Sequence, residues 1–157
     1  MQLDRTERHI LETLQRRGRI SNVELAEAVG LSESPCLRRM RALESSGVIR
    51  GYRAVLDQRL LGLQVTAFVQ VQLEKHDDRK TAEFLDRVSI EPHIVECHAM
   101  SGAYDYLLKV LAESMDHFSD LVMRDILRFP GVKDIESSFS LRTEKENAVM
   151  PIPAASS

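Results

Sequence analysis

The segment from Gly30 to Gly47 constrains this 157-residue chain more than any other stretch. Ser32 suits the N-cap of a helix, and Pro35 falls in the first turn, where the backbone N–H has no helical partner in any case. Gly47 can adopt the left-handed conformation that often follows a helix. These signals predict a single helix of roughly four turns.

The helical period separates this segment into an apolar face and a polar face. Leu37, Met40 and Leu43 share the apolar face, and the polar face carries Ser34, Arg38, Arg41 and Ser45. Arginine can grip phosphate or the O6/N7 edge of guanine, and phosphates bind well near a helix N-terminus. The polar face therefore predicts contact with an anionic, patterned partner. The segment by itself also leaves open an ordinary solvated face, because arginine is a good helix former.

Charge is divided unevenly along the chain, whose net charge is −3. Residues 1–56 carry ten Arg, no Lys and seven acidic residues, a balance of +3, whereas residues 57–157 have a balance of −6. Between Ser34 and Arg53, five Arg stand against one Glu. Such a local excess of positive charge attracts a phosphate backbone, so the predicted nucleic-acid partner belongs to the first part of the chain.

Two capping boxes predict two more helices before this segment. Asp4 with Glu7 opens the first helix, and Ser21 with Glu24 opens the second. Gly30 ends the second helix only a short turn before the third begins. Two helices joined in this way form a helix-turn-helix, in which the second of the pair enters the major groove of DNA.

Residues 48–56 follow as two β-rich runs around Gly51, which predicts a small hairpin, or wing, beside the groove. Three helices and a basic wing in this order predict a DNA-binding domain over residues 1–56. The predicted DNA-binding residues are Asn22, Ser32, Ser34, Pro35, Arg38, Arg39, Arg41, Arg50, Tyr52 and Arg53.

Four stretches of this domain resemble the leucine-responsive regulatory protein/AsnC (Lrp/AsnC) family: residues 18–25 (GRISNVEL), 29–32 (VGLS), 35–39 (PCLRR) and 47–52 (GVIRGY). The resemblance covers nearly the whole chain. It implies a transcriptional regulator that binds double-stranded DNA through a winged helix-turn-helix, in agreement with the residue patterns.

A connector at residues 57–64 precedes a second set of patterns. Strand patterns cover residues 65–73, 94–100, 106–111 and 132–141, and helical patterns cover residues 79–89 and 118–127. The order β-α-β-β-α-β predicts a ferredoxin-like domain over residues 65–147, with both helices on one sheet face. In the first of these helices, Ala82, Leu85 and Val88 are expected to face inward. The predicted fold class is α+β, a winged helix-turn-helix followed by a ferredoxin-like βαββαβ domain of the ACT-like or RAM type.

The second sheet face needs a cover, because we expect Phe68 and its alternating neighbours to be too apolar for water. This predicts a homodimer that pairs through the sheet and buries an area of interface size. Pairing would let two recognition helices read two half-sites on DNA. The resemblance implies the same sheet-to-sheet pairing and larger rings of dimers, with an octamer expected.

The segment from Met100 to Asp105 joins the two central strands and is the predicted small-molecule site. Asp105 can pair with an amino group while exposed backbone N–H groups hold a carboxylate, as an amino-acid zwitterion requires. A plain hairpin turn is the alternative. The resemblance implies an effector pocket at this loop, between dimers, with leucine, methionine or a similar amino acid as the ligand. The predicted effector-binding residues are Met100, Ser101, Gly102, Ala103, Tyr104, Asp105, Ser137 and Ser138.

Three functions compete at this point. The first is an effector-responsive transcriptional regulator of amino-acid metabolism genes. The second is an architectural DNA-bending protein without an effector, because Ala103 departs from the family pattern Gly-Asp-Tyr/Phe-Asp-Tyr. The third is an enzyme, for which the sequence shows no nucleophile–base pair, metal cluster or phosphate loop, so we predict that the chain is not an enzyme and carries no cofactor.

The remaining features are plain. No apolar run is long enough for a membrane span and no signal-peptide pattern is present, so we expect a cytoplasmic, nucleoid-associated protein. The histidines lack metal-site spacing, and Cys97 beside His98 is expected to be structural. Cys36 and Cys97 are expected to be reduced, with Cys36 in packing. Residues 148–157 are expected to form a loose tail.

Overall fold

The computed structural model describes residues 2–74, 77–146 and 149–154. The chain forms two compact units, one made of Met1–Val55 with Lys145–Ser157 and the other of Leu56–Glu144. Each unit has its own buried core. Within the described ranges, no helix is both long and apolar enough to cross a membrane.

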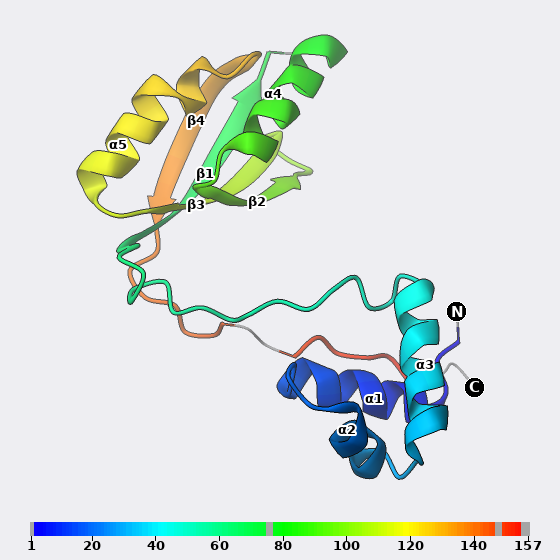
Figure 1. Cartoon of the computed structure of the whole chain (residues 1–157). Coiled ribbons are helices and arrows are strands. Elements are labelled where there is room, and N and C mark those ends of the chain that lie inside the picture. Colours follow the sequence, from blue (N-terminus) through cyan, green and yellow to red (C-terminus); the bar gives the residue numbers. More distant parts are fainter. Residues whose placement is uncertain (1, 75–76, 147–148, 155–157) are drawn as a thin grey trace. The chain divides into compact units, whose positions relative to one another are not determined.

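Three helices make up the N-terminal unit: α1 (Arg5–Arg16), α2 (Asn22–Ala28) and α3 (Glu33–Ser45) (Figure 1). Both predicted capping boxes are confirmed. The Asp4 carboxylate accepts from the Glu7 backbone N–H at 2.8 Å, and the Glu7 carboxylate accepts from the Asp4 N–H at 2.9 Å. Ser21 and Glu24 make the same reciprocal pair at α2. These bonds satisfy N–H groups that a helix otherwise leaves free at its start.

Helix α3 begins and ends where the sequence predicts. Ser32 is its N-cap residue, but the Ser32 side chain makes no capping hydrogen bond. At the other end Gly47 has a φ of +76°, the left-handed conformation that strains a residue with a Cβ atom. The Gly47 N–H donates to the Glu44 carbonyl at 3.0 Å and closes the last turn.

The core of the N-terminal unit joins all three helices. Its buried members are Ile10, Leu25, Ala26, Cys36 and Leu43. Cys36 has no exposed surface. Burial raises the pKa of its thiol, which keeps the group protonated, so the predicted packing role of Cys36 is confirmed.

The predicted wing does not form a hairpin in the single chain. Residues 48–56, all of them described, contain no strand, and residues 50–56 are exposed. Val55, the apolar residue that a hairpin would need to bury, is 73% exposed. A lone two-stranded hairpin whose apolar side chains have no surface to pack against does not offset the entropy lost on ordering its backbone.

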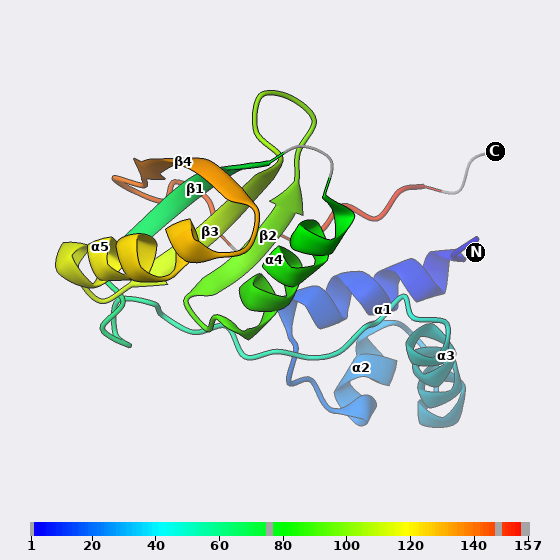
Figure 2. The ribbon, with the colours of Figure 1, turned by 90° about the horizontal axis from the view of Figure 1, so that it is seen from above.

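The second unit is a four-stranded antiparallel sheet with helices on one face (Figures 1 and 2). Residues 58–62 of the connector form turns before it begins. In chain order its elements are β1 (Val65–Leu73), α4 (Asp78–Ile90), β2 (Ile94–Ala99), β3 (Tyr106–Ala112), α5 (Met115–Arg124), a 3-10 turn η1 (Ile126–Arg128) and β4 (Val132–Phe139). The sheet order β2-β3-β1-β4 confirms the predicted ferredoxin-like arrangement.

Helix α4 faces the sheet with a different stripe from the one predicted. Phe84 and Val88 are buried, whereas Ala82 and Leu85 are exposed. The Phe84 ring lies 5.1 Å from the Tyr106 ring, centroid to centroid. An aromatic ring removes more apolar area from water than Ala or Leu, so the helix turns Phe84 inward and only Val88 of the predicted set remains in the core.

The open face of β1 is more polar than predicted. The residues of β1 that are buried toward the helices are Ala67, Val69, Val71 and Leu73. Phe68 points the other way and is 38% exposed, and its neighbours on that face are Thr66, Gln70 and Gln72. The expectation of apolar alternating neighbours was therefore wrong, because residues two apart on a strand share a face and those beside Phe68 are polar.

The C-terminal segment returns to the N-terminal unit. The Gln15 side chain of α1 accepts from the Met150 N–H at 2.6 Å and donates to the Met150 carbonyl at 3.1 Å. Met150 is thus held to α1 within the segment for which the sequence predicts a loose tail, and residues 148 and 155–157 of that tail lie outside the described residues. A glutamine amide can pair with both groups of one residue in an extended chain, as a neighbouring strand does.

Candidate functional sites

The polar face of α3 lies open on the surface of the N-terminal unit. Its four predicted members, Ser34, Arg38, Arg41 and Ser45, are all exposed or half-buried at the surface. The opposite side of the helix holds Cys36 and Leu43 in the core, so packing fixes which side faces outward. Both arginines project from a rigid helix toward solvent, where two guanidinium groups about one turn apart can contact phosphates or base edges.

Arg39 is placed differently from its neighbour Arg38. Its guanidinium forms an ion pair with the Asp4 carboxylate and lies 3.6 Å from the Glu7 carboxylate. The pKa of Asp4 is lowered, first by the hydrogen bond from the Glu7 backbone and also by Arg39. Arg39 therefore fastens α3 to the N-terminus of α1, a structural role that competes with its predicted role as a DNA contact.

Tyr52 lies against the end of α3. Its hydroxyl donates to the Glu44 carboxylate at 2.9 Å, and burial together with the Glu44 charge raises the Tyr52 pKa. The predicted phosphate contacts Arg50 and Arg53 are exposed on either side of it. The contact between Tyr52 and Glu44 thus holds the two arginines near the recognition helix even though no hairpin forms.

The other predicted DNA contacts sit at helix starts. Ser32 is exposed and Pro35 is half-buried in the first turn of α3. Asn22 opens α2 and is half-buried, and its Oδ1 atom is buried without a hydrogen-bond partner among the described residues. The carbonyl end of Asn22 therefore faces the protein, which weakens its case as a reader of DNA.

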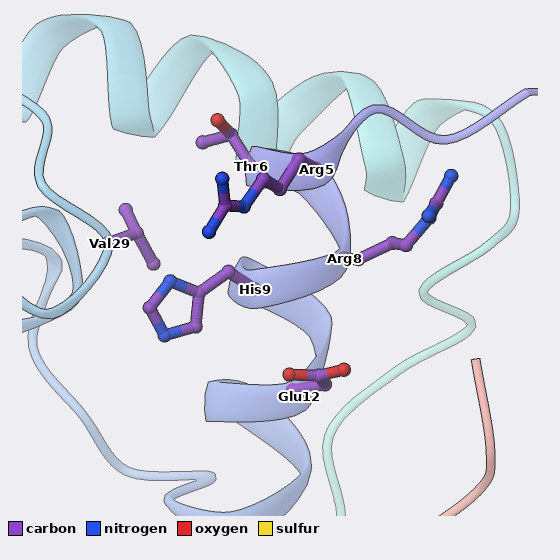
Figure 3. A pocket seen from close by; sticks show the side chains of 6 residues that line it. All are labelled: Arg5, Thr6, Arg8, His9, Glu12 and Val29. Carbon is purple, nitrogen blue, oxygen red and sulfur yellow. The ribbon is translucent and has the colours of Figure 1, made fainter. Parts of the chain in front are cut away.

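A hollow of about 520 Å³ lies beside α1, and none of the predicted site residues lines it (Figure 3). Figure 3 shows that five of its six lining residues, Arg5, Thr6, Arg8, His9 and Glu12, come from α1, and Val29 follows α2. Arg8 already donates to the Leu3 carbonyl at 2.6 Å. The mixed charges form no convergent set of donors or acceptors, so this hollow is a surface feature of the helix packing.

The loop from Met100 to Asp105 connects β2 to β3 and projects beyond the end of the sheet (Figure 2). Its ends are pinned: the Met100 N–H donates to the Asp105 carbonyl at 2.8 Å, and the Asp105 N–H donates to the Val71 carbonyl at 2.9 Å. Asp105 also accepts from the Leu73 N–H at 2.7 Å through Oδ2. One oxygen of the Asp105 carboxylate, which is predicted to meet an effector, thus ties the loop to β1, and the residue stays exposed.

The tip of the loop is open. Ser101, Gly102 and Ala103 are exposed, and Gly102 has a φ of +142°, a conformation that disfavours any residue with a Cβ atom. No other atom lies within 4 Å of where a Gly102 Cβ would stand. The glycine therefore serves the turn of the backbone and leaves free space on that side.

Tyr104 brings in a residue that sequence reasoning missed. Its hydroxyl donates to the Glu136 carboxylate on β4, and this hydrogen bond is the main cause of the raised Tyr104 pKa. The two residues are 32 apart in the chain, and only the pairing of β1 with both β3 and β4 places them together. No local motif marks Glu136, so the sequence contains no signal that would have found it.

Ser137 and Ser138 point to opposite sides of β4. Ser137 is half-buried on the helix side, and Ser138 is exposed on the open face. They pair with Val69 and Phe68, further from the loop than Glu136, which pairs with Gln70. Within one chain the structure therefore brings together Tyr104 and Glu136 at the loop but not the two predicted serines.

Cys97 and His98 do not form a joint site. Cys97 packs against the core and burial raises the pKa of its thiol, whereas His98 on the other face approaches Glu96 at 3.2 Å. Across the described part of the chain, no three His, Cys, Asp or Glu side chains are gathered as metal ligands.

Two family descriptions match the chain. Residues 66–150 match the Lrp/AsnC ligand binding domain, and residues 3–50 match a winged helix-turn-helix DNA-binding domain. The leucine-responsive regulatory protein of Rhizobium meliloti (strain 1021) is 40% identical over 146 residues, 93% of this chain and 94% of that protein. The protein of the same name from Escherichia coli (strain K12) is 41% identical over 145 residues, 92% of this chain and 88% of that protein.

Solved structures agree with these matches. A transcriptional regulator from Neisseria meningitidis, solved as a complex with L-Met, superposes with a TM-score of 0.91 at 40% identity, covering 95% of this chain and 96% of that one. An AsnC family transcriptional regulator from Agrobacterium tumefaciens gives a TM-score of 0.89 at 34% identity, covering 95% and 97%. These relatives are regulators rather than enzymes, and none of them supports the architectural alternative. The chain belongs to the Lrp/AsnC family, as a DNA-binding transcriptional regulator with an amino-acid ligand-binding domain.

Proposed function

We propose that this regulator reads DNA through the outward face of α3 and adjusts its DNA binding when an amino acid occupies the loop from Met100 to Asp105. The observation that carries the first part is the outward placement of Arg38 and Arg41 on a helix whose other side is locked in the core. Arg50 and Arg53 hold phosphates beside the groove. The regulated genes are those of amino-acid metabolism.

The effector is leucine, methionine or a similar amino acid. Support comes from the curated relatives named leucine-responsive regulatory protein and from the Neisseria meningitidis neighbour, which was solved with L-Met. The loop tip offers open space and a glycine turn, both suited to a small ligand. A coupling of about 1–3 kcal/mol between the two sites is enough to change DNA occupancy.

The working form is a homodimer, and the dimers assemble into an octamer. Two half-sites on a duplex call for two recognition helices related by two-fold symmetry. The open face of the sheet carries Phe68, Leu107 and Leu111 among polar side chains, the mixed composition of an interface between separately folded subunits. The proposed place of action of this regulator is the cytoplasm, on the nucleoid, in keeping with relatives from Rhizobium meliloti and Escherichia coli.

The DNA role is tested by selecting bound duplexes from a random pool with the wild-type chain, then titrating a selected and a scrambled duplex. In R38A and R41A the preference for the selected duplex should fall by about tenfold for each bidentate pair of hydrogen bonds that the substitution removes. E12A, a change on the exposed side of α1, serves as the control. If both arginine variants still prefer the selected duplex over the scrambled duplex as strongly as the wild type, Arg38 and Arg41 do not read the DNA sequence.

The effector role is tested by measuring the melting temperature of the wild-type chain with each of the twenty amino acids at millimolar concentration. A ligand present at 100 times its Kd stabilises the folded state by about 2.7 kcal/mol, so a selective shift names the effector. If no amino acid shifts the melting temperature, the effector part of the proposal fails while the DNA part stands.

A further inference from the structure

We infer that Glu33, the first residue of α3, reads DNA sequence by accepting a hydrogen bond from the amino group of a cytosine in the major groove. This inference rests on the proposed function, because it adds a specificity-determining residue to the helix proposed to read DNA. Glu33 is not among the residues that the sequence predicts as DNA contacts.

The first turn of α3 differs from the first turns of α1 and α2. In those two helices the glutamate three residues after the N-cap, Glu7 or Glu24, accepts from the backbone N–H of the N-cap residue. In α3 that position holds Pro35, and the acidic residue stands directly after the N-cap Ser32. The Ser32 side chain makes no capping hydrogen bond either, so Glu33 takes no part in a capping box.

The Glu33 carboxylate has no other partner among the described residues. Four of the seven acidic residues in residues 1–56 accept hydrogen bonds through their side chains: Asp4, Glu7, Glu24 and Glu44. Glu33 is exposed and pairs with no side chain in the described ranges. The positions three and four residues further along the helix are Cys36 and Leu37, so no basic side chain of α3 stands where it could form a helical ion pair with Glu33.

The backbone of the first turn fixes where this carboxylate stands. Cys36 is fully buried, and its N–H donates to the Ser32 carbonyl at 3.2 Å, which closes the turn against the core. The Cα–Cβ bonds of a helix tilt toward its N-terminus, so the side chain of the first residue extends beyond the helix start. The N-terminal residues of a recognition helix are the ones that contact base edges in the major groove. Glu33 therefore extends toward the bases when α3 enters the groove.

A carboxylate in the groove selects its partner by hydrogen-bonding chemistry. An ionised carboxylate only accepts hydrogen bonds, and phosphates repel it, so its presence at this end of α3 weakens DNA binding unless it meets a donor. The donors that bases present in the major groove are the amino groups of cytosine and adenine. Adenine places its N7 acceptor beside the amino group and suits an amide side chain, whereas the cytosine amino group is the usual partner of a glutamate.

The experiment maps base preference in the full-length wild type, E33Q and E27Q. The wild type first selects a duplex from a random pool, and each base pair of that site is then replaced in turn by the other three. E27Q is the matched control, because Glu27 on α2 is exposed and also pairs with no side chain among the described residues. Each protein is compared through the ratios of its own affinities, so any loss of folded protein cancels.

In the wild type, replacing one C·G pair of each half-site should weaken binding by about tenfold, within the range for a direct base contact. In E33Q that pair should lose its advantage, and A·T should be preferred at the same position, because glutamine pairs with adenine through two hydrogen bonds. E27Q should keep the preference of the wild type at every position.

An E33Q protein with the same base preferences as the wild type would overturn this inference and leave the reading of DNA by Arg38 and Arg41 intact. A wild type that selects no duplex from the pool would overturn both. A preference that weakens at every position of the site in E33Q would also overturn it, because Glu33 would then act through the helix as a whole and not on one base. The same holds if E27Q changes the preference at the same C·G pair, since the general loss of a negative charge would then account for the effect.

Discussion

Adjacent arginines on one helix can have different tasks. Arg38 lies on the polar face of α3, while Arg39, one residue on, is paired with Asp4 and Glu7 of α1. One step along a helix rotates the side chain by about 100°, which moves it from the outward, polar side to the side of a neighbouring helix. The arginine content of the segment predicts DNA contact for both, and only the packing of α1 separates them.

We expect R39A to lower the free energy of unfolding by about 0.5–1 kcal/mol, the range for partly exposed ion pairs, and to leave the sequence preference for DNA unchanged. Because the pKa of Asp4 is lowered in the folded state, this stabilisation is present above pH ~4 and is lost as the pH falls through the folded pKa. Urea unfolding of wild type and R39A at several pH values checks both statements.

R38A is the control: its free energy of unfolding should equal that of the wild type, and its preference for the selected duplex should be lower. An R39A variant as stable as wild type but with relaxed sequence preference would return Arg39 to the DNA interface.

Elements in this protein obtain their stability from the face they bury. The stretch from Val48 to Leu56 is rich in β-forming residues, but Val48, Val55 and Leu56 stay exposed and no strand forms. Helix α4 has two candidate apolar stripes, and the one with the larger ring is buried. In both cases burial decides the outcome where local propensity leaves a choice.

The arginines that follow α3 should contact phosphates and not bases. R50A and R53A should weaken binding to selected and scrambled duplexes by similar factors, because phosphate contacts carry no sequence information. Each substitution should reduce the slope of log affinity against log salt by about one. Titration at several salt concentrations measures this, and a slope equal to that of wild type would exclude these residues from phosphate contact.

Helix α4 should depend on Phe84 more than on Leu85. F84A should lower the free energy of unfolding by about 3–5 kcal/mol, the usual loss for a buried aromatic ring, whereas L85A should cost far less because Leu85 is 40% exposed. Urea denaturation of both variants compares them directly. If F84A and L85A lower the free energy of unfolding equally, the predicted inward face with Leu85 contributes as much to the core as Phe84 does.

At the scale of the whole molecule, the chain passes from the N-terminal unit into the second unit and then returns to the N-terminal unit. Residues 145–157 group with the N-terminal unit, and the Gln15 amide holds Met150 by both its backbone groups. The DNA-binding unit is therefore built from both ends of the chain, and a change in the last residues reaches α1.

We expect Q15A, and deletion of residues 149–157, to destabilise the N-terminal unit by about 1 kcal/mol, because each change removes the same pair of hydrogen bonds. Native-state hydrogen exchange should show faster exchange in α1, and R16A, an exposed neighbour, should show none of this. If α1 exchanges its amide hydrogens at the same rate in the deletion variant and the wild type, the C-terminal segment does not stabilise α1.

The sequence by itself determined most of the elements, the wing excepted. Capping boxes at Asp4 and Ser21, the left-handed turn at Gly47 and the periods of the strands act over a few residues, so they can be read locally. They predicted the three N-terminal helices and the β-α-β-β-α-β order of the second unit. The outward face of α3 follows from the same period.

The tertiary structure alone decided the partners of particular side chains. Packing pairs Arg39 with Asp4 of α1 and buries Phe84 in place of Leu85. Strand register brings Tyr104 to Glu136, and the return of the chain brings Met150 to Gln15. Such contacts depend on how whole elements dock, and docking is set by the summed burial of many side chains, which no local stretch of sequence contains.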